Sequence, residues 1–574
     1  MAESEGGLTE ELVVPARPIV LGSRARTRCY AAPAVRIPLL LYGLALAVRL
    51  VLIWHFPDPA YPDSFYYVDV ARALAAGDGF NVDFIWIFPE VGGVVPAQPV
   101  LPIPSNAHWM PLASLIQVPF LAVFGNVAWA SALPFALIGA TAAPLTWAIA
   151  RDARASRLVA IGAGILVAIP VLSLTYMVQP DNFSLYQPLV AGSLWMGARG
   201  LKGSPRSFAL AGLLAGAATL SRNDGLLVLV ALGLAFAWDR WRAWRSRGAS
   251  SQPAAAVPAR PAIPLTAAIA CVGLFVLVMA PWWIRQLAVF GSISPSSTSG
   301  RVFFIRDIGE WNSITAPATL DHLLGMGVGP FLATRVGGLV SAGMIFTTLI
   351  AGFVLVPFMV IGGWARRRSL DFGPFFLYAG LLFGFSAVVS AVHVPGGTFI
   401  HSAVALAPHA YILALEGIAI AVAWIAARRR AWDPTAATTV FTGAALAFAA
   451  VAALFGSLFV HAVWADSRAK FMAVAHALDG AGAPPTDRVM SIDASGTKYW
   501  TGRGGVVLVN DPIETVERVA RAYDTRWLVL DGEDSVKAAA PILDDVARPA
   551  WLGAPIVLRD DPSPLVILPV VPAS

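Results

Sequence analysis

The sequence has few charged residues and almost no cysteine. Asp, Glu, Lys and Arg make up 13% of its 574 residues, whereas 57% are hydrophobic. A single hydrophobic core stops growing at about 250–300 residues, so a soluble protein of this length has no place for so much apolar surface. The two cysteines, Cys29 and Cys271, are expected in a cytoplasmic tail and in a membrane span, which excludes a disulfide framework.

Apolar runs of roughly 20 residues fill most of the chain, and they indicate a polytopic α-helical membrane protein. The net charge is +5. Its basic residues gather in short clusters between the runs, which follows the positive-inside rule and excludes a nucleic-acid-binding patch. The clusters lie at 24–28, 151–157, 199–206, 239–247, 366–368 and 428–430.

Placing all six clusters in the cytoplasm predicts about 11 transmembrane helices, with the N-terminus inside and the C-terminus outside. A multi-pass protein of the plasma membrane is expected. The first span lacks a small-residue cleavage pattern, so it is expected to stay as an anchor. The predicted spans are 37–56, 127–150, 157–177, 183–198, 206–220, 225–239, 264–284, 336–363, 372–392, 403–427 and 436–463.

Two apolar segments need a special place in this scheme. The stretch 110–124 must not cross, because a crossing there would put a basic cluster outside, so it is predicted to lie in or dip into the outer interface. Residues 206–241 as one helix would measure about 54 Å, against a hydrocarbon core of about 30 Å. The chain must therefore turn back at "SRNDG" (221–225), which places Arg222 and Asp224 at the outer face.

The composition changes after residue 463. Short apolar runs at 488–493, 506–510 and 526–531 predict buried strands, and an amphipathic helix, capped by Asp511, is predicted between the last two. Strand, helix and strand predict a small extracytoplasmic α/β domain. No Gly-rich phosphate loop precedes its helices, which argues against a nucleotide site. The predicted divisions are a cytoplasmic tail (1–36), a transmembrane domain (37–463) with a first outer loop (57–110), a flexible cytoplasmic loop (250–264) and the α/β domain (464–574).

Polar residues collect on the predicted outer face. Carboxylates and arginines from separate loops suit a reaction with an anionic lipid, in which arginine holds a phosphate and a carboxylate accepts a proton. These residues are Asp58, Asp63, Asp69, Arg72, Asp78, Asp83, Glu90, His108, Asp181, Arg222, Asp224, Arg285, Arg301, Arg306, Asp307, Glu310, His393 and His401.

Five stretches carry a resemblance to a known family. "YPDSFYYVDVARALAAGDGF" (61–80), with an acid, aromatics and a Gly-containing end just after the first span, is similar to the first-loop signature of the GT-C glycosyltransferases. It resembles in particular glycosyltransferase family 39 and the dolichyl-phosphate-mannose protein mannosyltransferase-like proteins. Weaker agreement is found at "HWMPL" (108–112), which departs from the family's double proline, at "GLLAGAATLSRNDGLLVL" (212–229), at "PWWIRQLAVFGS" (281–292) and at "YWTGRGGVVLV" (499–509).

The resemblance implies a GT-C-like enzyme of the cell envelope that uses a polyprenyl-phosphate sugar as its donor. Asp63 matches the family's catalytic acid and Asp181 a second acid, while donor-phosphate contacts fall on Arg222 or Arg285. The absence of an Asp-x-Asp motif agrees with a lipid-linked donor. The further candidates for donor or substrate binding are Tyr66, Tyr67, His108 and Asp69.

Such a donor fixes the mechanism that the sequence predicts. Its phosphate leaves already charged, so it needs the bidentate fork of an arginine more than a proton. A carboxylate beside the acceptor hydroxyl would remove its proton in an inverting attack. No metal ligands are assigned, although a divalent cation is left open as a cofactor. A metal-binding trio is disfavoured, because the three histidines would lie about 80° apart on a helix; they are His393, His401 and His409.

Each candidate also has a structural alternative. Asp63 could have the purely structural role of capping the helix that begins near Ser64. Asp181 could simply be an aspartate in a turn, where this residue is common. Arg285 could extend to the interface from the end of a span, and Asp69 could form an ordinary helix pair with Arg72. Arg222 could simply lie in an exposed hairpin. His108 could be a residue of the membrane interface that forms a hydrogen bond there.

Three function classes therefore remain from the sequence. The first is a hexosyl- or pentosyltransferase acting on a lipid, glycan or protein acceptor among membrane lipids. The second is a lipid or solute transporter or flippase, which would have buried charges at mid-membrane. The third is a membrane scaffold without catalysis. The position of the polar residues at the outer ends of the spans favours the transferase.

Overall fold

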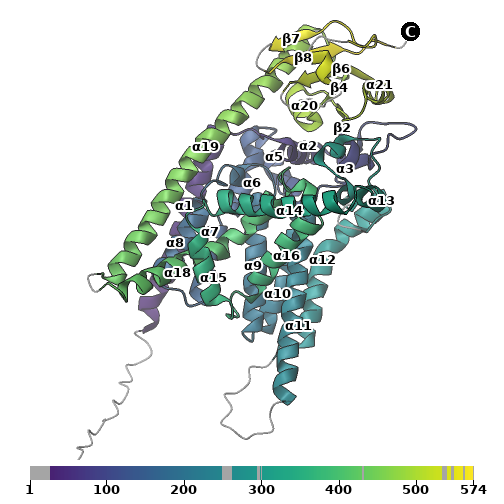
Figure 1. Cartoon of the computed structure of the whole chain (residues 1–574). Coiled ribbons are helices and arrows are strands. Elements are labelled where there is room, and N and C mark those ends of the chain that lie inside the picture. The colour runs from purple at the N-terminus through teal and green to yellow at the C-terminus, as the bar shows by residue number, and fades with distance from the viewer. Residues whose placement is uncertain are drawn as a thin grey trace, which may run out of the picture.

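The computed structural model describes residues 26–248, 262–293, 298, 300–429, 432–532, 539–543, 548–559 and 563–572 (Figure 1). Most of the expected cytoplasmic tail and of the expected loop 250–264 lies outside the described residues.

Helices form the elongated body of the molecule (Figure 1). Among the described residues, six helices are long and apolar enough to cross a membrane: Val35–His55, Ala128–Asp152, Leu265–Phe290, Val328–Ile350, Thr398–Ala426 and Pro434–Gly480. They confirm a multi-pass helical membrane protein, and the total of about 11 spans stays a prediction. The helices of the body are α1 (Arg26–His55), α6 (Ala128–Gly139), α7 (Ala142–Asp152), α8 (Arg157–Ala168), α9 (Phe183–Leu201), α10 (Pro205–Ser221), α11 (Leu226–Gly248), α12 (Leu265–Phe290), α14 (Val328–Ile345), α15 (Val356–Arg366), α16 (Gly373–Val388), α18 (Ala407–Ala426) and α19 (Pro434–Gly480).

The predicted turn at 221–225 is confirmed. Helix α10 ends at Ser221, Arg222 is extended, and a short 3₁₀ turn, η2 (Asn223–Gly225), leads into α11. Gly225 packs so closely on α10 that an added Cβ would lie 2.6 Å from the backbone of Ala218. The turn is therefore fixed by a close backbone contact, and Arg222 lies within it as the C-cap residue of α10.

The span predicted over 336–363 is not one helix, which corrects the sequence analysis. Helix α14 continues into a π-helical turn (Phe346–Ile350) and then stops, because Gly352 and Phe353 both adopt positive φ, of 57° and 60°. Two successive left-handed residues cannot continue a right-handed helix. Helix α14 runs across the bundle and α15 runs along it (Figure 1).

Shorter elements lie at one end of the bundle. The stretch 110–124, expected at the outer interface, forms two helices that are each too short to cross a core of about 30 Å. The elements of this region are α2 (Pro62–Ala76), β1 (Asn81–Val82), β2 (Phe84–Ile85), α3 (Ile87–Val91), β3 (Ile103–Pro104), α4 (Leu112–Leu115), α5 (Val118–Phe124), η1 (Tyr176–Val178), η3 (Arg301–Phe304), η4 (Ile308–Asn312), α13 (Leu320–Leu324), η6 (Ala391–His393), α17 (Thr398–Ala403) and η7 (Val404–Leu406).

The C-terminal segment folds around a six-stranded sheet with the order β2-β5-β4-β6-β8-β7. Strands β2, β5, β4 and β6 are parallel, and β8 is antiparallel to β6 and β7. The predicted strands correspond to β4, β5 and β6. The elements are β4 (Arg488–Ser491), α20 (Ala494–Thr501), β5 (Gly505–Val507), α21 (Ile513–Ala522), β6 (Thr525–Asp531), α22 (Ala540–Leu543), β7 (Ile556–Arg559) and β8 (Leu565–Pro569).

This C-terminal segment is not separate from the rest of the chain. Strand β2 belongs to the first loop and pairs in parallel with β5. Phe84 and Ile85 of β2 share one hydrophobic core with Val506 and Leu528 of the C-terminal strands. Helix α19 has 47 residues and runs about 70 Å without a break, through the boundary expected at 463 and 464.

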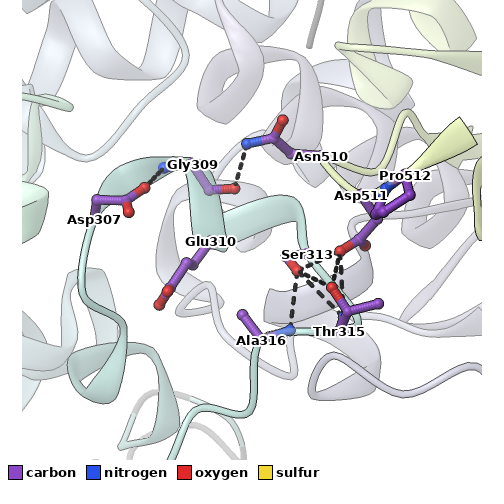
Figure 2. Close-up of a pocket in the computed structure, with 9 residues that line it drawn as sticks. All are labelled: Asp307, Gly309, Glu310, Ser313, Thr315, Ala316, Asn510, Asp511 and Pro512. Carbon is purple, nitrogen blue, oxygen red and sulfur yellow. Dashed lines mark hydrogen bonds between the residues drawn. The ribbon is translucent and has the colours of Figure 1, made fainter. Parts of the chain in front are cut away.

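Asp511 has a different role from the predicted one. Helix α21 begins at Ile513 with Pro512 as its N-cap residue. The Asp511 carboxylate instead accepts hydrogen bonds from Ser313 Oγ (2.6 Å) and from the Thr315 hydroxyl (Figure 2). It also accepts the Ile314 N–H at 2.7 Å. Asp511 thus ties the C-terminal sheet to the loop after η4.

Candidate active site

The first turn of α2 presents Asp63. Pro62 occupies the first helical position, where its missing N–H costs nothing. The Ser64 hydroxyl accepts hydrogen bonds from the N–H groups of Ala60 and Tyr61, both at 3.0 Å, and so ends the preceding loop. Ser64 therefore stabilises the start of the helix. The Asp63 carboxylate points elsewhere and accepts the indole N–H of Trp109 at 2.8 Å.

Asp63 lies in a cluster with Asp181 and His401. One ligand atom from each of the three residues falls within 4.8 Å of the others. His401 Nε2 lies 3.0 Å from Asp181 Oδ2 and 3.5 Å from Asp63 Oδ2. The side chain of Asp181 is fully buried, whereas that of Asp63 is 29% exposed. Asp63 is thus the acid of this pair that a substrate can reach.

The neighbours of the two acids give them different pKa values. Burial and then the charge of Asp181 raise the pKa of Asp63, against the opposing effects of His401, Trp109 and Arg222. Burial alone would raise the pKa of Asp181 too. His401, however, together with hydrogen bonds from the Asn182 N–H (2.5 Å) and the Tyr61 hydroxyl (2.9 Å), lowers that pKa below its usual range. Asp181 is therefore the stronger acid of the two.

The orientation of His401 makes this cluster a candidate cation site. The ring stacks on Phe183 at 4.2 Å between ring centres, and Nδ1 lies 2.9 Å from the Gly397 carbonyl. A carbonyl only accepts, so Nδ1 carries a proton and donates it there, and Nε2 faces the two carboxylates. Either a proton or a cation must lie between these atoms. Two carboxylates and an imidazole, with the far ring nitrogen bonded to a carbonyl, form a donor set that fits a divalent metal.

Arg222 lies beside this cluster. Its Nε donates to Asp224 Oδ1 (3.0 Å) and to Ser402 Oγ (3.1 Å), and Nη2 donates to the Thr398 carbonyl (3.3 Å). The Ser402 hydroxyl also donates to Asp224. Burial alone would lower the pKa of Arg222, but Asp224 raises it, so the guanidinium stays charged. Helix α17 links the two groups, because it carries both His401 and Ser402.

A cavity of about 570 Å³ joins Asp63, Arg222 and His401. One wall is aromatic, with Trp109 6.4 Å from Trp86 between ring centres. His108 lies edge-on between Trp109 (5.2 Å) and Trp311 (5.5 Å). Further lining residues are apolar and come from α11, directly after the Arg222 turn, and from α16 and α17. They include Leu226, Leu227, Phe385 and Phe399.

Four of the predicted site residues besides Asp63 lie in or directly behind this cavity. Arg222, Tyr67 and His108 line it, and Tyr67 Oη accepts from Asn182 at 3.3 Å. Burial lowers the pKa of His108 to about 3, so it is neutral. Tyr66 lies behind the wall, stacked on Trp109 with 4.1 Å between ring centres.

Two predicted residues lie away from the cavity. Arg285 donates to the Ser105 carbonyl at 2.9 Å and packs over the rings of Phe80 and Trp282 at 4.8 and 4.9 Å, so it braces the first loop. Asp69 is 3.8 Å from Arg72, the ordinary helix pair that the sequence allowed. Neither residue is among those that line the cavity. Their predicted roles as donor-binding residues gain no support from this arrangement.

Two residues of the site, Trp109 and His401, have roles that the sequence did not predict. His401 was recognised as an outer-face residue, but only a trio with His393 and His409 was considered. His393 lines the cavity and bonds to the Val302 carbonyl, and His409 stacks on Phe375. The sequence does contain one sign of a role for His401, because it is a polar residue that lies just before an apolar span.

A second cavity, of about 430 Å³, lies on the other side of η4 (Figure 2). Ile308 and Trp311 face the first cavity, whereas Gly309 and Glu310 face the second. Glu310 there is bonded to His322 Nε2 (2.9 Å) and to the Arg306 N–H (2.8 Å). Its polar groups are engaged in holding the loops together.

Residues 105–258 match the family model described as dolichyl-phosphate-mannose-protein mannosyltransferase. The match includes Asp181 and Arg222. The resemblance to this family is confirmed. It supports a membrane glycosyltransferase of the GT-C type.

Solved structures are also similar to the chain. ArnT from Cupriavidus metallidurans bound to undecaprenyl phosphate is 13% identical, over 95% of this chain and 98% of that chain, with a TM-score of 0.49. The same protein in the apo state is 14% identical over the same shares, with a TM-score of 0.48. The oligosaccharyltransferase of Archaeoglobus fulgidus, tethered to an acceptor peptide, is 13% identical over 88% of this chain and 70% of that chain, with a TM-score of 0.47. None of the curated proteins compared with the chain matches it.

Proposed function

We propose that the chain transfers a sugar from a polyprenyl-phosphate donor to an acceptor at the outer face of the plasma membrane, with inversion at the anomeric carbon. The observation that carries this proposal is the cavity itself, which puts a reachable carboxylate (Asp63), a charged guanidinium (Arg222) and an apolar wall side by side. These are the three features that the acceptor hydroxyl, the phosphate and the lipid chain of such a donor need.

Asp63 is the general base of the proposed reaction. The acceptor hydroxyl gives its proton to the Asp63 carboxylate while its oxygen forms a bond to the anomeric carbon on the face opposite the phosphate. The bond between that carbon and the phosphate oxygen breaks, and its electron pair stays on the phosphate. A positioned base of this kind is worth about 10²–10⁴-fold in rate. The raised pKa of Asp63 suits this task, because it makes the carboxylate a better proton acceptor.

Arg222 stabilises the leaving phosphate in this proposal. Asp224 and Ser402 fix the guanidinium from one side and keep it charged. Its position beside Leu226 and Leu227 lets the lipid chain leave the cavity along α11. A divalent cation held by Asp63, Asp181 and His401 would add positive charge near the phosphate.

The aromatic wall is the proposed place of the sugar ring. Trp86, Trp109 and Trp311 offer flat apolar faces. The two histidines of this wall, His108 and His393, are neutral, because burial lowers the pKa of each. The transferred sugar is a hexose or pentose, and its acceptor is a lipid, a glycan or a protein. The C-terminal sheet lies on the same side of the membrane as this cavity, and the N-terminus lies in the cytoplasm.

The transporter alternative is less well supported. It requires charged groups at mid-membrane that can face a transport path. Arg49 is buried in α1, but it donates to the carbonyls of Ala45 (3.1 Å) and Ala168 (3.3 Å), at the end of α8. Both carbonyls bond to Nη1, and the C-terminal end of α8 carries a partial negative charge that favours a cation there, whereas Nε and Nη2 find no hydrogen-bond partner among the described residues.

The test is transfer by the purified enzyme. Radiolabelled polyprenyl-phosphate sugars are incubated with membrane extract, and labelled products are separated from the donor. The Asp63→Asn variant should lose at least 10²-fold in rate. Asp78→Asn, an exposed acid of the same loop, is the matched control and should keep the wild-type rate. An Asp63→Asn enzyme of undiminished activity would overturn the proposal.

A further inference from the structure

The far end of α11 carries an exposed stripe of tryptophan and arginine. Trp238, Trp241, Arg242 and Arg245 are spaced by three and four residues, so they share one face of the helix. The Arg242 guanidinium lies 4.8 Å from the ring centre of Trp238, and that of Arg245 lies 4.1 Å from the ring centre of Trp241. Trp238 and Trp241 are 42% and 46% exposed. We call these four residues the Trp–Arg stripe.

The Trp–Arg stripe lies at the opposite end of the bundle from the cavity. Helix α11 begins at Leu226 in the cavity wall. The 20 residues from there to Arg245 rise about 30 Å, which is the thickness of a hydrocarbon core. The last turns of α11 project beyond the neighbouring helices (Figure 1). With Leu226 at one membrane boundary, Arg245 lies at the headgroups of the other leaflet, and Trp238, about 10 Å before it along the helix, lies among the lipid chains next to those headgroups.

Three other helices end with the same pair at this end of the molecule. In each, an arginine lies over a tryptophan three or four residues before it. The pairs are Arg199 on Trp195 in α9 (5.4 Å), Arg367 on Trp364 in α15 (4.2 Å) and Arg428 on Trp424 in α18 (3.8 Å).

Several acidic residues at this end are already paired with other groups. Lys202 bridges Asp152 (2.9 Å) and Asp371 (2.6 Å), and Arg366 binds Glu416. Asp239, the acid next to Trp238 in α11, is buried and accepts the Ile263 N–H at 2.8 Å.

We propose that the Trp–Arg stripe binds the headgroups of anionic phospholipids in the leaflet opposite the cavity. Tryptophan prefers the boundary between lipid chains and headgroups. An arginine held over its ring is positioned to bind a phosphate with two parallel hydrogen bonds. An anionic lipid adds a net negative charge that a zwitterionic lipid lacks, and each arginine near such a surface contributes about 1 kcal/mol. This inference does not depend on the sugar-transfer reaction.

Lipid binding to the purified full chain in detergent tests the proposal. Native mass spectrometry measures the affinity for phosphatidylglycerol and for phosphatidylcholine, with inorganic phosphate as a third probe. The wild type should bind phosphatidylglycerol at least 10-fold more tightly than phosphatidylcholine. In the double variant Arg242→Gln/Arg245→Gln this affinity should fall about 30-fold, the equivalent of about 2 kcal/mol.

A control variant removes the same charge elsewhere. Arg521→Gln/Arg526→Gln changes two arginines of the C-terminal sheet region and should bind phosphatidylglycerol like the wild type. If the double stripe variant does not elute as a single species, the single variants Arg242→Gln and Arg245→Gln should each lose about 5-fold. An unchanged affinity in the stripe variants would overturn the proposal, as would equal binding of both lipids. Competition by millimolar inorganic phosphate would overturn it as well, because it would show a site for small anions.

Discussion

Replacing Trp109 by Phe should move the pH dependence of sugar transfer. Trp109 donates its indole N–H to Asp63 Oδ1 at 2.8 Å, and this hydrogen bond lowers the pKa of Asp63 against burial and the charge of Asp181. Phenylalanine keeps the aromatic stack on Tyr66 but donates nothing. A hydrogen bond to a charged group is worth about 1.5–3 kcal/mol, and one pKa unit corresponds to about 1.4 kcal/mol. The pKa of Asp63 should therefore rise by about 1–2 units.

The direction of the effect follows from the role of Asp63 as a base. The carboxylate loses its activity as the pH falls through its pKa, so a higher pKa moves the acid limb of the pH–rate profile to higher pH. The assay is the initial rate of transfer between pH 4 and 9, with saturating donor. Below the wild-type limb the variant should be about 10–100-fold slower, and at high pH its rate should approach that of the wild type.

Trp86 provides the control for this experiment. It lines the same cavity 6.4 Å from Trp109, and its indole N–H finds no hydrogen-bond partner within the described part of the chain. Trp86→Phe should leave the acid limb of the pH–rate profile at the same pH as in the wild type, even if the KM for the donor changes. A Trp109→Phe enzyme whose limb coincides with that of the wild type would refute the reasoning, since the hydrogen bond would then not set the pKa of Asp63.

Three further predictions follow from the site and its support. Arg222→Lys keeps the charge but loses the planar fork, and transfer kinetics should show a 10–100-fold lower kcat/KM. Mn²⁺ binding, followed by electron paramagnetic resonance, should be present in the wild type and at least 10-fold weaker in His401→Ala, because one of three ligands is lost; equal binding would place the cation elsewhere. Gly225→Ala forces a Cβ to within 2.6 Å of the Ala218 backbone, which should lower the free energy of unfolding by about 1–3 kcal/mol. The thermal unfolding midpoint in detergent should therefore fall, and an unchanged midpoint would contradict the close contact.

The sequence predicted those features that depend on local pattern. Hydropathy and length alone placed the turn at 221–225, because a helix of 36 residues cannot fit a core of about 30 Å. The strands β4, β5 and β6 were predicted from short apolar runs. The break within 336–363 could not be seen, because it depends on the backbone of Gly352 and Phe353 inside an apolar run.

The candidate site was only partly predictable for a similar reason. Asp63 and Asp181 came from motifs, but their proximity to His401 depends on how α17 packs, and residues 181 and 401 are 220 positions apart. Likewise, "HWMPL" drew attention to His108, whereas the residue that bonds to Asp63 is its neighbour Trp109. Spacing along a helix cannot reveal a partner contributed by another helix.

The pairing of β2 with β5 has a consequence for biosynthesis. Phe84 and Ile85 must wait for Gly505 and Val506, more than four hundred residues later, before their edge of the sheet is complete. Ser495 likewise donates to the carbonyl of Pro62, directly before Asp63. A ribosome that stops early therefore releases a protein whose membrane part is largely made, but whose reactive loop lacks its last support. Only a full-length product can finish assembling the surroundings of Asp63.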